Sequence, residues 1–323
     1  MNPVRIYIPL LLAAALLVGG FQAASAQDEP PACEAPAVHA IATVGMVADV
    51  VRNVGGSCVE VTALMGPGVD PHLYRASEGD VLRLLNADII FYSGLHLEAR
   101  LAELFEEMTA VKTTVPVANA IPEEMRLRDP NFDQIDPHVW MDAELWSYTV
   151  GSTRDALVTY DPAHEAYYDA NAEAYLEQLE ELDAYVHEQI ERIPEEQRVL
   201  VTAHDAFQYF GKGYGVEVFA PQGITTATEA GVNDIRRTIE LLVSRNIPAV
   251  FVESSVPPDI VEAIVAGAEA QGQELSIGGQ LFSDAMGEDG TPEGTYIGMI
   301  RHNVDTIVAA LTGEATATPE AGA

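Results

Sequence analysis

The sequence predicts an α/β protein of two lobes, each with a mostly parallel sheet flanked by helices, joined by one long backbone helix. The chain has 323 residues, more than usually fold around one hydrophobic core. This length suits two lobes of about 100 to 150 residues each. In both halves, short apolar runs alternate with helical stretches, which is the pattern of α/β units around a parallel sheet. A long helical segment without a strand pattern separates the halves.

The strands and helices of each half follow from local patterns. In the first half we expect strands within residues 39–45, 59–66 and 87–94, and helices at 46–56 and 78–86. In the second half we expect strands within 198–207, 249–255 and 275–282, and helices at 233–246 and 258–272. The apolar runs are too short for helices and rich in Val, Ile and Phe, as strands are.

The segment 161–197 is bounded by Pro162 and Pro194 and predicts one long helix over 163–193. Its approximate apolar stripe consists of Ala166, Tyr167, Ala170, Ala174, Leu179, Leu182 and Val186. The chain therefore divides into an N-terminal lobe at 39–160, a linking helix at 161–197 and a C-terminal lobe at 198–312.

The first residues have the composition of a secretory signal peptide. Arg5 supplies positive charge, residues 6–20 are an apolar run shorter than the roughly 20 residues of a membrane span, and Ala24-Ser25-Ala26 forms a cleavage site. We assign 1–26 to the signal peptide and expect the mature protein to lie outside the cytoplasm, in the periplasm or at the cell surface. Residues 27–38 read as a tether and 313–323 as a disordered tail.

Charge and cysteine content narrow the classes of partner. The net charge of −34 excludes nucleic acid as a partner and is compatible with attracting cations. Cys33 and Cys58 could pair in an oxidising compartment, and two thiols are a weak basis for a zinc ribbon. A lipid anchor on Cys33 is disfavoured, because "EPPAC" lacks the small apolar residues that precede a lipidated cysteine.

The tripeptide Asp-Pro-His occurs twice, ending at His72 and at His138. Proline biases the preceding residue toward extended backbone and donates no hydrogen bond, so each histidine should begin a rigid turn rather than lie inside a helix. A fixed imidazole on a loop suggests a ligand, although Asp-Pro is also a common opening for an ordinary turn.

Two more candidate ligands follow predicted strands. His204 comes after "VLVT" and Asp284 after "GGQLF". Ligands of open α/β sheets bind outside the carboxyl ends of the strands, so His72, His138, His204 and Asp284 could converge in one crevice between the lobes. Three imidazoles and one carboxylate suit zinc, or manganese at lower affinity, whereas calcium and magnesium prefer more oxygen ligands.

These residues lie within motifs that resemble a known family. The segments are "VGMVADVVRNVGG", "GVDPHLY", "ADIIFYSGLHLE", "DPHVWMD", "VTAHDAFQYF", "VFVESSVPP" and "GGQLFSDAMGEDGTPEGTYIGMIRHNVDTIVAAL". Together they resemble the zinc/manganese-binding solute receptors of ABC importers, cluster A-I, and most of all the TroA type, over about residues 39–312. The resemblance implies the same four metal ligands, two lobes on a backbone helix with limited hinge motion, a permease partner in the membrane and a monomer.

The resemblance also bears on the choice of metal. Manganese-specialised members typically have glutamate at the third ligand position, where this chain has His204, which favours zinc. Many zinc receptors carry a His-rich loop before the second ligand, whereas residues 121–135 of this chain contain no histidine. Manganese therefore remains an alternative metal. Glu253 and His96, near strand ends, are candidates to support the ligands, with helix capping an alternative for Glu253.

Two other classes of function fit the sequence less well. A secreted zinc metalloenzyme would need three protein ligands and an open position, whereas four protein ligands close the zinc shell. The His-Glu-x-x-His motif is absent, because Tyr168 and Glu191 stand where its second histidine would be. The sequence contains no repeat array that would support an adhesin or a surface interaction module. The expected function is therefore capture of Zn²⁺, or Mn²⁺, for delivery to an ABC permease, without enzymatic chemistry.

Overall fold

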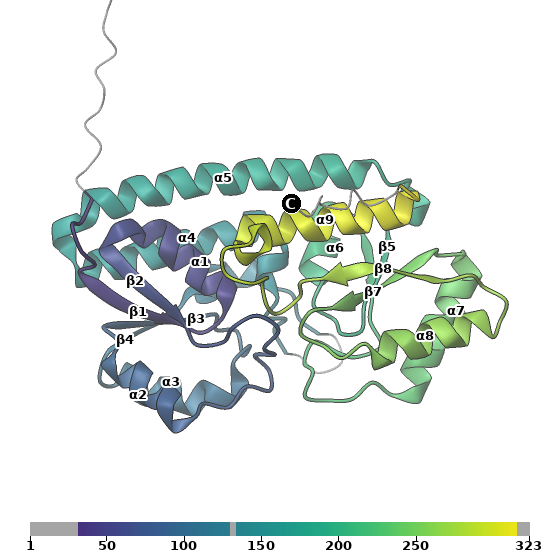
Figure 1. Cartoon of the computed structure of the whole chain (residues 1–323), viewed down its shortest axis with the longest axis horizontal. Coiled ribbons are helices and arrows are strands. Elements are labelled where there is room, and N and C mark those ends of the chain that lie inside the picture. Colours follow the sequence, from purple (N-terminus) through teal and green to yellow (C-terminus); the bar gives the residue numbers. More distant parts are fainter. Residues whose placement is uncertain (1–31, 130–133, 315–323) are drawn as a thin grey trace, which may run out of the picture.

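The computed structural model describes residues 32–129 and 134–314. The predicted signal peptide, residues 27–31 of the tether and residues 315–323 of the tail lie outside the described residues. Within the described ranges, the structure has the predicted α/β architecture of two lobes joined by one long helix (Figure 1). No helix in these ranges is both long enough and apolar enough to cross a membrane.

The first lobe contains a four-stranded parallel sheet in the order β2-β1-β3-β4. The strands are β1 (Val38–Ala42), β2 (Val59–Ala63), β3 (Ile89–Tyr92) and β4 (Thr113–Pro116). Helices α1 (Gly45–Gly55), α2 (Glu78–Asn86) and α3 (Ala102–Thr109) connect them. Ala40 of β1 pairs with Val61 of β2 and Ile89 of β3, so β1 is buried within the sheet and is almost wholly apolar, as a central parallel strand requires.

The second lobe contains two parallel strand pairs, β5-β6 and β7-β8. Their strands are β5 (Val199–Val201), β6 (Glu217–Phe219), β7 (Ala249–Glu253) and β8 (Ser276–Leu281). The helices of this lobe are α6 (Gln208–Tyr214), α7 (Val232–Arg245) and α8 (Asp259–Glu269). The carboxyl ends of β5, β7 and β8 lead into the residues of the site described below.

Helix α5 (Glu165–Glu191) follows a 3-10 turn at Pro162–His164 and extends over both lobes (Figure 1). Its 27 residues correspond to about 40 Å at 1.5 Å per residue. Helices α4 (Ala143–Tyr160) and α9 (Tyr296–Thr312) pack against it. The long helix is thus confirmed, with its ends two residues inside the predicted limits.

The predicted apolar stripe of α5 is wrong at its three alanines. Ala166, Ala170 and Ala174 are exposed, and Tyr168 and Tyr175 are buried instead. The physical reason is that each buried tyrosine hydroxyl donates a hydrogen bond to a carboxylate. Tyr168 donates to Asp161 and Tyr175 donates to Asp49, both at 2.8 Å. A tyrosine can therefore supply more buried apolar area than alanine without leaving its hydroxyl unpaired.

One apolar core continues from the first lobe through α5 and α9 into the second lobe. It joins Phe91 of the first sheet, Leu179 of α5 and Val304 of α9 to Leu200 and Phe251 of the second lobe. A smaller cluster lies among β5, β7, α7 and α8. Because the larger core crosses between the lobes, separating them would expose apolar surface, which limits hinge motion.

Cys33 and Cys58 form a disulfide with their Cα atoms 5.0 Å apart, which settles the pairing that the sequence left open. Cys58 ends a 3-10 turn at Gly56–Cys58, directly before β2. The disulfide therefore fastens the segment that precedes β1 to the start of β2, and the Cys33 sulfur is not free to carry a lipid.

Candidate metal centre

Four side chains from four separate segments meet at one buried point between the lobes. They are His72 from the loop after β2, His138 from the segment before a 3-10 turn at Val139–Met141, His204 from the residues after β5 and Asp284 from the residues after β8. One ligating atom from each lies within 4.8 Å of the others. These residues are 5, 0, 0 and 1 % exposed, respectively. The four candidates thus converge, as strand-end positions predicted.

The separations between these atoms match the edges of a small coordination shell. His138 Nε2 lies 3.3 Å from both His72 Nε2 and His204 Nε2. The Asp284 carboxylate lies 3.4 Å from His138 Nε2 and His204 Nε2 and 3.7 Å from His72 Nε2. A tetrahedral shell with bonds of about 2.0 to 2.2 Å has ligand atoms about 3.3 to 3.6 Å apart. The arrangement therefore fits one four-coordinate ion.

The Asp284 carboxylate is the clearest sign that this point suits a cation. Both of its oxygens are buried and make no hydrogen bond, because the nearby imidazole nitrogens lie at 3.4 to 3.7 Å without hydrogen-bond geometry. A buried ionised carboxylate without hydrogen bonds costs several kcal/mol. A divalent cation among the three imidazoles would supply the missing charge and bind both kinds of donor.

Carboxylates behind two of the imidazoles fix their orientation. His138 Nδ1 lies 2.7 Å from Asp136 Oδ1, and His204 Nδ1 lies 2.6 Å from Glu253 Oε2. A carboxylate accepts, so Nδ1 must donate, and Nε2 is the ring nitrogen directed at the centre. Glu253 Oε1 also accepts from the backbone N–H groups of Ala203 at 2.9 Å and His204 at 3.0 Å. The Glu253 carboxylate thus fixes both the backbone and the ring of His204.

The two Asp-Pro-His copies build the same turn. In each, the aspartate Oδ1 accepts from the histidine backbone N–H two residues later, at 2.8 Å for His72 and 3.0 Å for His138. The copies differ in their remaining contacts. Asp136 also holds the His138 ring, whereas Asp70 Oδ2 accepts from the hydroxyl of Thr226, at 2.5 Å, in the second lobe. Asp70 therefore ties the His72 loop to the opposite side of the site.

Burial and mutual charge set the protonation of the metal-free site. Burial alone would lower the pKa of His204, but the Asp284 and Glu253 carboxylates outweigh it and raise this pKa to about 10. Burial raises the pKa of Asp284 to about 7, against the opposing effect of His204. Burial and the neighbouring imidazoles lower the pKa of His72 and His138. Near neutral pH the His204 ring therefore carries a second proton, on Nε2, and a metal ion must displace it.

The remaining predicted residue, His96, lies elsewhere. It is exposed, has a left-handed backbone with φ of 68° and lines a surface pocket with Phe105 and Asn119. The contacts that Asp136 and Thr226 make at the site were not predicted from the sequence. The fixed spacing of Asp and His in both copies was a usable signal for Asp136, whereas the contact of Thr226 depends on how the lobes meet.

Trp140 forms one wall of the centre. Its ring packs edge-on against His138 with centroids 5.3 Å apart, and its Nε1 donates to the carbonyl of Ser283 at 2.8 Å. Because Ser283 precedes Asp284, this bond also connects the His138 segment to the Asp284 segment. The wall excludes water, which strengthens the interaction of any bound ion with its ligands.

Comparisons with known proteins identify metal-binding relatives of the chain. A family model described as zinc-uptake complex component A, periplasmic (ZnuA), matches residues 41–310. The zinc-binding protein TroA of Treponema pallidum is 46% identical over 295 residues, which cover 91% of this chain and 95% of TroA. The manganese-binding lipoprotein MntA of Bacillus subtilis is 47% identical over 270 residues, which cover 84% of this chain and 88% of MntA.

A solved structure is also similar. The periplasmic zinc-binding protein TroA from Treponema pallidum superposes with a TM-score of 0.83 at 47% identity, covering 85% of this chain and 99% of that one. The two sequence relatives are named for different ions at nearly equal identity, so similarity alone does not choose between zinc and manganese.

Proposed function

The chain belongs to the ZnuA family of periplasmic zinc-uptake components, and from that premise we propose that it captures Zn²⁺ between its lobes and delivers it to a membrane permease. It is an extracytoplasmic, metal-binding receptor of an ABC transporter and not an enzyme. Its cargo is a divalent metal ion. The ion and the ligands are the parts that we propose.

We assign the cargo site to His72, His138, His204 and Asp284. The observation that carries this assignment is the Asp284 carboxylate, which is buried without a hydrogen bond beside three imidazole nitrogens at 3.4 to 3.7 Å. Such a group needs a cation. The supporting carboxylates Asp136 and Glu253 hold two of the imidazoles with Nε2 toward that position.

We propose zinc as the cargo because four protein donors complete a tetrahedral shell. Zinc takes nitrogen and carboxylate donors in this geometry, whereas manganese favours carboxylate, carbonyl and water in a six-coordinate shell. Zinc also stands above manganese in the order of affinities for a given site. Manganese is the alternative cargo, because the relative MntA is a manganese-binding lipoprotein.

The partner is the permease of an ABC importer, and we expect the receptor to be a monomer that contacts it. Size-exclusion chromatography with light scattering tests the oligomeric state. A stable dimer of the metal-loaded protein would contradict the expectation.

The test of the cargo assignment is elemental analysis of protein exported in its own host and purified without chelators. We expect one zinc ion per chain, and a larger manganese share in His204→Glu, because a carboxylate replaces an imidazole. His187→Glu, on the exposed face of α5, is the matched control and should keep zinc. Manganese in the wild type would refute zinc as the cargo, and absence of stoichiometric metal would refute the site itself.

A further inference from the structure

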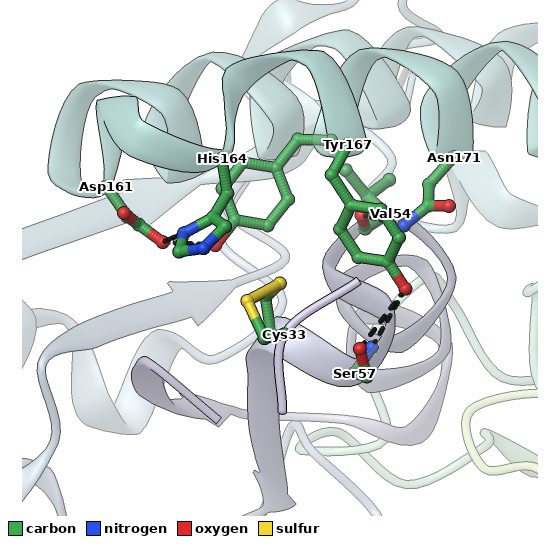
Figure 2. Close-up of a disulfide and its surroundings, with 9 residues drawn as sticks. Cys33, Val54, Ser57, Asp161, His164, Tyr167 and Asn171 are labelled. Atoms are coloured by element: carbon green, nitrogen blue, oxygen red, sulfur yellow. Dashed lines mark hydrogen bonds and ion pairs between the residues drawn. A yellow bond between two sulfur atoms is a disulfide. The ribbon is translucent and has the colours of Figure 1, made fainter. Parts of the chain in front are cut away.

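A second group of metal-binding atoms lies at the corner where α4 passes into α5. The sulfurs of Cys33 and Cys58 and one ring nitrogen of His164 lie within 4.8 Å of one another. Figure 2 shows the His164 ring extending from this corner over the disulfide. Cys58 is buried, while Cys33 and His164 are partly exposed, so an ion could reach the group from solvent. It shares no residue with the centre between the lobes.

The His164 side chain is held in a fixed orientation. Its Nδ1 lies 2.6 Å from Asp161 Oδ2, and the same oxygen accepts from the Tyr168 hydroxyl at 2.8 Å. Because the carboxylate makes Nδ1 the donor, Nε2 is the ring nitrogen left for a metal. A carboxylate behind an imidazole is the device that orients histidine ligands at metal sites, and it is the one seen at His138 and His204.

The corner is also connected by bonds that do not depend on the disulfide. Tyr167 of α5 meets Ser57 through its hydroxyl, 3.3 Å from both the backbone nitrogen and Oγ, and Asn171 donates to the Val54 carbonyl at 3.1 Å (Figure 2). On the other side, the backbone N–H of Ala37 donates to the Cys58 carbonyl at 2.8 Å. Without the sulfur–sulfur bond, these contacts still hold the Cys58 turn against α5 and the segment that follows Cys33 against Cys58.

We propose that reduction of the Cys33–Cys58 disulfide opens a second metal site, in which two thiolates and His164 Nε2 bind a thiophilic divalent cation such as Zn²⁺. A dithiol reductant supplies two electrons and two protons, so that the disulfide becomes two thiols and the reductant becomes a disulfide. Binding of the cation then releases the two thiol protons to solvent. Two sulfurs and one imidazole are a donor set that zinc accepts, and water completes the shell.

The site is therefore governed by redox state: oxidised protein carries one ion per chain and reduced protein carries two. The test is zinc titration of the full mature protein before and after treatment with a phosphine reductant, with bound metal counted by elemental analysis after removal of free zinc. Circular dichroism of the reduced protein checks that it stays folded. We expect one and two zinc ions, respectively, and a cobalt-loaded reduced sample with sulfur-to-cobalt charge-transfer absorption that oxidised protein lacks.

Two histidine variants make the test specific. In reduced His164→Ala, the affinity for the second ion should fall at least about tenfold, with loss of most of the sulfur-to-cobalt absorption and no change in the first ion. His187→Ala, farther along α5, is the matched control and should bind both ions. A single ion in folded, reduced wild type would overturn the proposal. Unfolding on reduction, or a second ion unaffected by His164→Ala, would overturn it as well.

Discussion

Glu253→Gln should weaken metal binding without removing a ligand. Glu253 accepts three hydrogen bonds, two from backbone N–H groups through Oε1 and one from His204 Nδ1 through Oε2. In glutamine only one of the two positions can accept. If its oxygen faces the two backbone groups, its amide N–H₂ faces His204 Nδ1, which must then lose its proton. The proton moves to Nε2, where it blocks the metal.

The size of this effect follows from the same contacts. The reverse orientation of the amide would place its N–H₂ against two backbone N–H donors, where it can form no hydrogen bond, so this orientation is unfavourable too. Loss of a supporting partner behind a metal-bound histidine typically costs 10- to 100-fold in affinity. Because all three hydrogen bonds are buried, we expect the upper end, about 100-fold, or about 2.7 kcal/mol.

The assay is a competition titration of zinc against a chelating dye at pH 7.5, on wild type, Glu253→Gln and the control Glu262→Gln, whose side chain is exposed on α8. The control should bind as wild type does. A zinc affinity of Glu253→Gln within threefold of wild type would refute the reasoning that this carboxylate sets the tautomer of His204.

Three other predictions follow from the site. Asp284→Asn should abolish the zinc-dependent rise in Tm while raising the Tm of the metal-free protein by about 2 to 4 °C, or about 1 kcal/mol, because two carboxylates then no longer share one imidazolium; a lower metal-free Tm would contradict this. Zinc affinity should fall about tenfold per pH unit below pH 9, as binding displaces the proton of His204, whose pKa is raised to about 10. The fall should steepen to about a hundredfold per unit below the pKa of Asp284, raised to about 7, since both groups must be deprotonated to bind; competition titrations giving equal affinity at pH 6 and 8 would refute it. Thr226→Val removes the hydrogen bond to Asp70 across the lobes, worth about 1.5 kcal/mol, so zinc release into excess chelator should be about tenfold faster by stopped flow; an unchanged rate would exclude this role.

The sequence was enough to predict that the four candidate ligands lie close together. His204 and Asp284 follow strand patterns, and the carboxyl ends of parallel strands open on one side of a sheet. Both Asp-Pro-His copies form the expected turns, because the aspartate binds the backbone two residues later. These are local signals, which depend little on how distant segments pack.

Features that depend on tertiary packing could not be read in the same way. The bond between Thr226 and Asp70 joins residues 156 positions apart. Tyr168 and Tyr175 replace the predicted alanines on the buried face of α5 because Asp161 and Asp49 happen to lie opposite them. His96 has the same strand-end position as the candidate ligands, yet its left-handed backbone accompanies an exposed side chain. Strand-end position is therefore a useful guide only when several residues agree.

X-ray absorption spectroscopy of the oxidised protein loaded with one zinc ion would identify the donor atoms around the ion itself. The assignment predicts about four nitrogen and oxygen donors at about 2.0 to 2.2 Å, with the outer-shell scattering of three imidazoles. A sulfur donor at about 2.3 Å, or a six-coordinate shell of oxygens, would contradict the site formed by His72, His138, His204 and Asp284.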